Sequence, residues 1–391
     1  MKILYISSPP FADCDFPLIK SLQKAGNDVT YLIHLTPYNL KSTLFNIKKQ
    51  IKKNSIIPAS YYPELKVYEQ YMDLNKTFII NQISPKDSSF SAFKLLLKVI
   101  CFIYKEKFDI IHTDNIFNVW YISLYYLFRK KLILTVHDPF PHSGETSTRK
   151  SINYKAAMKL VKYFVLLNNK QKDKFCQTYK LNPKRILINR LGIYDNIQIF
   201  TKHNITSNPH NVLFFGRISP YKGIEYLCQA MIEVRKYIPD ASLTIAGGGK
   251  IYFDIEPYRQ YNWINIQNRY IEMQELAQLL QKCSISVCPY TDATQSGVIM
   301  TSYSLCKPVI ASNVGGLSEM IDNEKSGVLV PPKDIKALSN AIINILDNRK
   351  LYADMQQYIK KQYYNGDRSW ESIADKYINF YKSCQCDKDL I

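Results

Sequence analysis

Two cations and a glycine follow the apolar run at 211–215, and together they could bind a diphosphate. Gly216 and Arg217 come directly after the run, and Lys222 follows in the same short loop. A guanidinium fork and an ammonium point charge on one loop suit the oxygens of a diphosphate. The alternative is that both are ordinary solvated cations between a strand and a helix. The spacing therefore predicts an anion site.

A second loop in the same half carries small residues at a predicted helix start. The segment CPYTDATQSGV indicates a strand end, a loop, and a helix that begins near Ser296, Gly297 and Val298. Small residues let a ligand approach backbone N–H groups, where the positive end of the helix dipole favours phosphate. Two such loops in successive strand–helix units indicate a nucleotide-diphosphate site.

Histidine and aspartate follow two predicted strands of the first half, FDIIHT and KLILTV. Asp114 follows the first strand, and His137 and Asp138 follow the second, with His142 a little further on. In a doubly wound sheet the carboxyl ends of the strands face the ligand crevice, where a His–Asp pair can handle protons. The alternative is that His137 only terminates a strand and His142 is an ordinary loop histidine.

The elements that must position these residues indicate two α/β domains, each a doubly wound parallel sheet. Strands at 2–7 and 28–33 flank a helix at 16–24, which is a Rossmann-like opening. The predicted domains are residues 1–200, residues 201–365, and a last helix at 366–391, with a linker at 201–210.

The ordered pieces FFGRISPYKG, LTIAGGG, CPYTDATQSGV, KPVIASNVGGLSE and SGVLVPPKD resemble the donor domain of glycosyltransferase family 4, the group-1 glycosyltransferases. The resemblance implies the GT-B fold, in which two Rossmann-like domains face a cleft. In that fold the N-terminal domain binds the acceptor and the C-terminal domain binds the nucleotide-sugar donor. The last helix returns to the N-terminal domain.

The resemblance also assigns roles to individual residues. It makes His137, Arg217 and Lys222 the catalytic candidates, and it places Asp114, Asp138 and His142 on the acceptor side. The donor-binding set that it implies is Gly216, Arg217, Lys222, Tyr270, Ser296, Gly297, Val298 and Thr301. The family usually carries a Glu-x7-Glu motif, and Ala293 and Thr301 occupy those two positions here.

The predicted function is transfer of a sugar from a nucleotide-diphosphate sugar to a glycan or lipid-linked acceptor, in cell-surface polysaccharide or glycoconjugate synthesis. The resemblance implies retention at the anomeric carbon. No metal and no other cofactor is predicted, because no carboxylate and histidine residues have metal-ligand spacing. Two alternatives stay open: a GT-B nucleotide-sugar epimerase, and a non-catalytic nucleotide-sugar-binding module.

Charge and composition favour a membrane surface as a further partner. Residues 1–200 contain 30 Lys and Arg against 14 Asp and Glu, so +16 of the net +18 lies there. Segments 40–54 and 91–107 are predicted as basic amphipathic helices, typical of anionic membrane surfaces. The alternative is that both pack on their own domain. No nucleic-acid motif is present, and an odd nine cysteines favour reduced thiols. The predicted location is cytoplasmic, peripheral to the inner face of the cell membrane.

Overall fold

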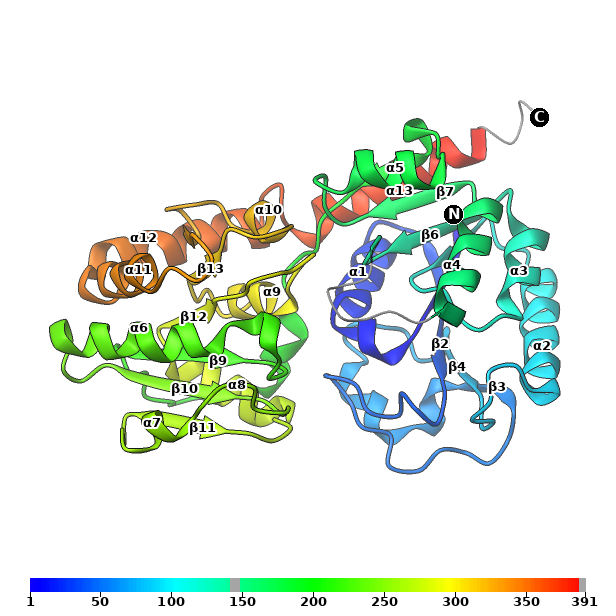
Figure 1. The fold of residues 1–391 in the computed structure, drawn as a ribbon. Helices are drawn as coiled ribbons and strands as arrows, with labels where there is room; N and C mark the ends of the chain where they lie inside the picture. Colours follow the sequence, from blue (N-terminus) through cyan, green and yellow to red (C-terminus); the bar gives the residue numbers. More distant parts are fainter. Residues whose placement is uncertain (141–147, 387–391) are drawn as a thin grey trace. The chain divides into compact units, whose positions relative to one another are not determined.

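The chain divides into two compact units in the computed structural model, which describes residues 1–140 and 148–386 (Figure 1). Unit 1 comprises Met1–Leu191 and Trp370–Ile391, and unit 2 comprises Gly192–Ser369. Both are parallel-sheet α/β domains, which confirms the predicted fold class.

Unit 1 contains an eight-stranded sheet in the order β3-β4-β2-β1-β5-β6-β7-β8, and β3 is its antiparallel edge strand. The central strands are buried, as expected for a sheet covered on both faces. The elements are β1 Lys2–Ser7, α1 Ala12–Lys24, β2 Asp28–Leu35, β3 Ser55–Pro58, β4 Thr77–Asn81, α2 Phe90–Glu106, β5 Ile110–Thr113, α3 Tyr121–Phe128, β6 Leu132–Val136, α4 Thr148–Leu160, β7 Tyr163–Leu166, α5 Lys172–Tyr179, β8 Ile186–Ile188 and α13 Trp370–Cys386.

Helices α2, α3 and α4 share one hydrophobic core with the sheet, as Figure 1 also indicates. Helix α13 packs beside α1, and Lys24 forms an ion pair with Glu371 at 3.0 Å. Within the core, His112 of β5 contacts the hydroxyl of Tyr381 at 2.5 Å. The last helix is therefore an integral part of unit 1.

Unit 2 contains a six-stranded parallel sheet in the order β11-β10-β9-β12-β13-β14. The order reverses beside β9, and ligands bind parallel sheets at such a switch point. The elements are β9 Asn211–Phe215, α6 Ile224–Tyr237, β10 Ser242–Ala246, α7 Glu256–Arg259, β11 Ile264–Gln267, α8 Met273–Lys282, β12 Ile285–Cys288, α9 Gly297–Tyr303, β13 Val309–Ser312, α10 Leu317–Met320, β14 Gly327–Val330, α11 Ile335–Asp347 and α12 Arg349–Ile359.

The predicted linker at 201–210 lies inside unit 2, so that prediction is wrong. The chain already joins unit 2 before this segment, because the Tyr194 N–H donates to the Met300 carbonyl at 3.2 Å. The Gln198 amide donates to the carbonyl of Ser304 at 2.6 Å. These bonds move the boundary from the expected position at residue 200 to Leu191.

The predicted helix at 40–54 is also wrong. The segment forms a tight turn, in which the Ser42 hydroxyl accepts from the Phe45 N–H at 3.2 Å. Further on, the Asn81 side chain donates to the carbonyls of Ile51 and Lys53, both at 2.7 Å. Such side-chain bonds compete with the helical ladder. Leu44, Phe45 and Ile47 of the segment are buried within unit 1.

The second predicted amphipathic segment does form a helix, α2, which begins after the capping residue Ser89. Its inner residues, such as Leu96 and Ile100, belong to the core of unit 1. None of the helices in the described part of the chain has the length and hydropathy that a membrane crossing requires.

Candidate functional site

The cation loop after β9 packs against the loop after β12. Gly223 has a φ of 61°, and a Cβ there would lie 2.1 Å from the carbonyl oxygen of Pro289. Only glycine fits this position, because the backbones touch and φ is left-handed. The Thr291 N–H donates to the Tyr221 carbonyl at 2.8 Å. The two loops that the sequence singled out therefore meet.

The two predicted diphosphate ligands have different surroundings within this loop. Arg217 is exposed, whereas the Nζ of Lys222 lies 3.7 Å from the centre of the Tyr290 ring. Burial lowers the pKa of Lys222, and the like charge of Arg217 adds to the fall, although Tyr221 offsets part of it. A bound anion would stabilise this partly desolvated ammonium.

The first turn of α9 adjoins the cation loop. A Cβ at Gly216 would touch the side chain of Val298 at 3.6 Å, and a Cβ at Gly297 would lie 2.9 Å from the Tyr194 ring. Ser296 is buried before the helix, and its hydroxyl is 3.3 Å from that of Tyr290. Gly216, Ser296, Gly297 and Val298 are thus gathered at one place. Sequence reasoning missed Tyr194, because one tyrosine among 30 carries no signal.

The glycine run at 247–249 places the end of β10 against the cation loop. A Cβ at Gly247 would lie 1.9 Å from the carbonyl oxygen of Gly216, and one at Gly249 would lie 2.1 Å from that of Ile218. The absence of side chains in this run allows the close approach. Gly248 lies beside the backbone at Tyr270, whose side chain is 37% exposed.

The two positions that lack the family carboxylates have other partners. A Cβ at Gly315 would lie 1.6 Å from the carbonyl oxygen of Ala293, so the backbone of Ala293 packs directly against Gly315. The Thr301 hydroxyl donates to the Gly297 carbonyl at 2.9 Å. Its proton is therefore used within α9, and only its lone pairs could serve a ribose.

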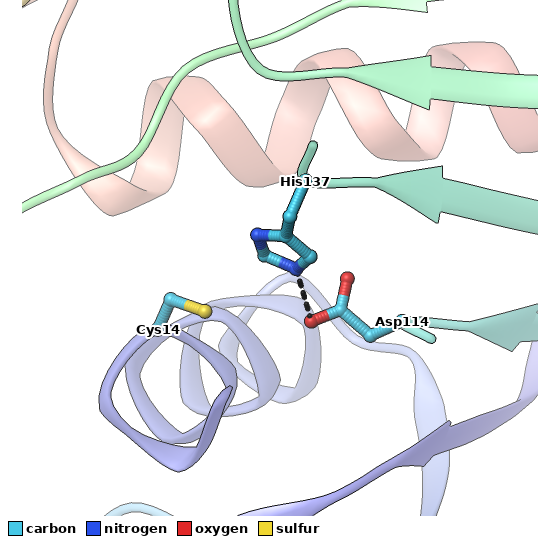
Figure 2. A group of neighbouring side chains, drawn as sticks. All are labelled: Cys14, Asp114 and His137. Carbon is cyan, nitrogen blue, oxygen red and sulfur yellow. Dashed lines mark hydrogen bonds and ion pairs between the residues drawn. The ribbon is translucent and has the colours of Figure 1, made fainter. Parts of the chain in front are cut away.

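In unit 1, the predicted histidine and aspartate meet at the ends of neighbouring strands (Figure 2). The Nε2 of His137 lies 2.9 Å from Oδ2 of Asp114, because β5 and β6 pair in parallel and end side by side. The ring of Phe11 stacks on the imidazole at 4.1 Å and 19°. Strand register therefore brings these two side chains together.

A second buried carboxyl supports the pair. Asp15 of α1 is fully buried, hydrogen-bonds to Asp114, and accepts from the Tyr31 hydroxyl at 2.9 Å. Burial and the Asp114 charge raise the pKa of Asp15, so this carboxyl holds the proton. Burial alone would raise the pKa of Asp114, but the charge of His137 and its hydrogen bond lower it below the usual value.

The histidine responds to the same charges. Burial lowers the pKa of His137, but the charge and hydrogen bond of Asp114 and the charge of Asp138 outweigh it, so the pKa lies above its ordinary value. Both shifts favour the charged forms, an imidazolium beside a carboxylate. Sequence reasoning missed Asp15, which lies on a helix face that is otherwise apolar.

Cys14 lies beside this pair in Figure 2, and the ligand atoms of Cys14, Asp114 and His137 lie within 4.8 Å of one another. The thiol donates to the Phe11 carbonyl at 3.1 Å, and burial and the charges of Asp15 and Asp114 raise its pKa. A protonated thiol is a poor metal ligand. The spacing of Cys14, Asp114 and His137 in the sequence does not predict this cluster, because the three residues come from separate elements.

A cavity of about 720 Å³ opens beside His137 within unit 1. Its described lining combines aromatic rings, amides and hydroxyls with three aspartates and contains no lysine or arginine. The acceptor-side candidates Asp114 and Asp138 both line it, and His142 lies outside the described residues. The aspartates are Asp87, Asp114 and Asp138, and the aromatic residues include Phe11, Tyr38, Phe117 and Tyr154.

Several known proteins resemble this chain. It is 27% identical to an uncharacterized glycosyltransferase of Methanocaldococcus jannaschii over 55% of each chain, so it matches about half the length of the first curated relatives. It is 23% identical to the UDP-Gal:alpha-D-GlcNAc-diphosphoundecaprenol alpha-1,3-galactosyltransferase of Escherichia coli, over 78% of this chain and 84% of that one. The structure of Anabaena HepE in complex with UDP superimposes with a TM-score of 0.64 at 14% identity, covering 98% and 100% of the chains.

Two family matches divide the chain between them. Residues 18–194 match Glycosyltransferase Family 4, and residues 195–362 match Glycosyl transferases group 1. The matches fall in order and meet near the boundary of the two structural units. The chain belongs to the group-1 glycosyltransferases.

Proposed function

We propose that this protein transfers a sugar from a nucleotide-diphosphate sugar to a glycan or lipid-linked acceptor. The observation that carries the proposal is the packing of the cation loop, with Arg217 and Lys222, against the loop that leads into α9. Both loops follow strands beside the switch point of the unit 2 sheet, where a nucleotide is expected.

The two cations would stabilise the departing diphosphate, whose charge grows as the bond to the sugar breaks. Arg217 would contribute a planar fork from an exposed position, and Lys222 a charge that is already partly desolvated. Two cations and backbone N–H groups need no metal for this task. Uridine diphosphate is the first nucleotide to test, because the E. coli relative and the HepE structure both carry UDP in their names.

His137 would act as a hydrogen-bond donor rather than as a base. Its partner Asp114 is buried, and the lowered pKa of that carboxyl and the raised pKa of the imidazole both favour the protonated ring. A protonated ring can orient a sugar hydroxyl or polarise a substrate oxygen. Phe11 holds the ring in one plane for this contact.

The cavity beside His137 would bind an uncharged sugar at the end of the acceptor. Aromatic faces suit sugar rings, and amide and carboxylate groups suit hydroxyls. Three aspartates and the lack of a lining lysine or arginine disfavour a phosphate in the cavity. The name of the E. coli relative contains a lipid-linked diphosphate acceptor. If this protein uses an acceptor of that kind, the diphosphate would stay outside the cavity.

We further propose the product configuration and location that the sequence predicts: retention at the anomeric carbon, and a cytoplasmic site peripheral to the membrane's inner face in cell-surface polysaccharide or glycoconjugate synthesis. The basic first half supports an anionic membrane as partner. Among the alternatives, the binding module has support from Ala293 and Thr301, which replace both family carboxylates.

Incubation of the purified protein with a panel of UDP-sugars and neutral oligosaccharide acceptors tests the proposal. Transfer is expected, and NMR of the product gives its anomeric configuration. Epimerised donor without a glycosylated product would favour the epimerase. Nucleotide binding without turnover, for lipid-linked as well as soluble acceptors, would favour the binding module.

A further inference from the structure

The outward faces of α2 and α3 expose large apolar side chains in unit 1. Leu97 and Tyr104 of α2 are 43% and 57% exposed, and Tyr126 and Leu127 of α3 are 55% and 48% exposed. Phe90 begins α2 and is 67% exposed. A contiguous cluster of exposed apolar side chains marks an interaction surface.

These side chains belong to one layer of the molecule. Tyr104 of α2 packs on Phe128 of α3 with ring centres 5.0 Å apart, and Phe93 packs on Trp120 at the same distance. The inner faces of both helices join a single core, and the helices lie on the same side of the sheet in Figure 1. Their outer faces are therefore presented together. We call this surface the α2–α3 face.

The side chains on this face that carry a charge at neutral pH are basic. Residues 88–105 and 115–131 contain no Asp or Glu. The lysines Lys94, Lys105 and Lys130 are exposed. Lys94 lies 4.8 Å from the ring centre of Phe90, and Arg129 lies 4.6 Å from that of Tyr126. The nearest acid on α2, Glu106, is paired with Lys2 at 2.9 Å.

We propose that the α2–α3 face docks on an anionic lipid surface. Aromatic side chains favour the headgroup region, and lysines extend from the apolar layer to lipid phosphates. Charge disfavours pairing with the same face of a second copy of this chain, because two such faces would oppose cation to cation. The same charge favours lipids with a net negative charge over zwitterionic lipids.

This proposal differs from attachment by net charge alone. Simple electrostatic attachment is lost when salt screens the charges, whereas buried apolar side chains resist salt. The α2–α3 face therefore predicts binding that weakens in high salt without disappearing. Docking does not depend on the proposed transfer reaction, since a soluble acceptor could be used without any membrane.

Flotation with phosphatidylcholine vesicles, with and without phosphatidylglycerol, tests the proposal. Replacing Lys94, Lys105 and Lys130 with Gln should lower partition onto anionic vesicles roughly 100-fold, from about 1 kcal/mol for each cation. Replacing Leu97, Tyr104 and Tyr126 with Ser should abolish the binding that remains in high salt. The matched control replaces the exposed Lys48, Lys49, Lys52 and Lys53 with Gln, which removes more charge from a segment of unit 1 outside the two helices.

Three results would overturn the proposal. Both α2–α3 variants could partition onto anionic vesicles as wild type does, or the control could lose as much binding as the lysine variant. The wild-type protein could also bind vesicles of phosphatidylcholine alone as well as it binds anionic vesicles. UDP affinity and the melting temperature report whether each variant is folded. If the triple Ser variant unfolds, Tyr126→Ser alone should still reduce binding in high salt. Transfer to a soluble acceptor should be unchanged in the lysine variant, so failure of docking is distinguishable from failure of the proposed activity.

Discussion

The two units hold their charged groups in opposite ways. In unit 1, the Asp114–His137 pair is buried, and Asp15 supports it from a second element. In unit 2, Arg217 and Lys222 share one loop, where Arg217 is exposed and Lys222 lies against aromatic rings. Charges of the first kind are positioned by folding, whereas those of the second kind are arranged to gain from a bound anion. Substitutions should therefore affect the two sites differently.

The largest effect is expected in unit 2. Arg217→Ala and Lys222→Ala should each weaken UDP binding about 10- to 100-fold, because a hydrogen bond to a charged group contributes roughly 1.5–3 kcal/mol. Transfer should fall further, since charge on the diphosphate grows toward the transition state. Calorimetry measures the first effect and steady-state kinetics the second.

The matched control for these variants is Lys236→Ala, which removes an exposed lysine of the same unit that pairs with Glu233 at 2.7 Å. It should bind UDP as wild type does. Unchanged affinity in both Arg217→Ala and Lys222→Ala would remove the donor site from this loop. Arg217→Lys should restore only part of the affinity, because the planar fork is lost.

The next largest effect should lower transfer without changing UDP affinity, which distinguishes the site of unit 1 from that of unit 2. His137→Ala should reduce transfer about 100-fold and leave UDP affinity unchanged, because this histidine belongs to unit 1. His210→Ala is its control, since His210 also pairs with an aspartate, Asp240, at 2.8 Å, but on an exposed surface of unit 2. Equal activities of the two variants would leave the buried pair without a role in transfer.

Asp15→Asn tests whether the buried charges of unit 1 are arranged as described. Folding raises the pKa of Asp15, so the stability that this carboxyl contributes is complete below its unfolded pKa of about 4 and is lost as the pH rises toward the native value. Asparagine does not titrate. Above about pH 4, the free energy of unfolding of the variant should therefore rise relative to that of wild type, by at most about 1.4 kcal/mol per pH unit.

Urea denaturation at a series of pH values measures this gain. Asp240→Asn, at an exposed carboxyl of unit 2, serves as the comparison and should show no rising advantage. Parallel pH profiles for Asp15→Asn and wild type would mean that Asp15 is ionised in the folded protein.

The smallest effect concerns Thr301. Because its hydroxyl already donates to the Gly297 carbonyl, Thr301→Val should change UDP affinity by less than about fivefold. Ser302→Ala removes a similar bond, to the Val298 carbonyl at 2.8 Å, and should match it. A tenfold loss confined to Thr301→Val would assign its hydroxyl to the ribose.

The sequence predicted most of the fold because buried parallel strands are continuous apolar runs. The strand 2–7 matches β1, and the helix predicted to begin near Ser296 to Val298 begins at Gly297. The helix predicted at 40–54 fails for a local and a tertiary reason. The apolar spacing suits a helix, but the Ser42 side chain bonds to the nearby Phe45 backbone, and Asn81 bonds to the Ile51 carbonyl from a distant strand.

The same limit applies to the sites. The sequence predicted Arg217, Lys222, Asp114 and His137 because they follow strands, and the topology of a parallel sheet brings strand ends together. Asp15 and Tyr194 could not be found in this way, since their importance depends on packing between distant segments. The roles of all these residues stay predictions until the substitutions are measured.

The position of α13 has a consequence for how the protein is made. Unit 1 is synthesised first, yet Tyr381, which contacts the buried His112, leaves the ribosome only after all of unit 2. Unit 2 is continuous in the chain and is available to fold as soon as it emerges. The nascent first domain must therefore wait with an unfilled groove beside α1, which makes it the expected client of chaperones during translation.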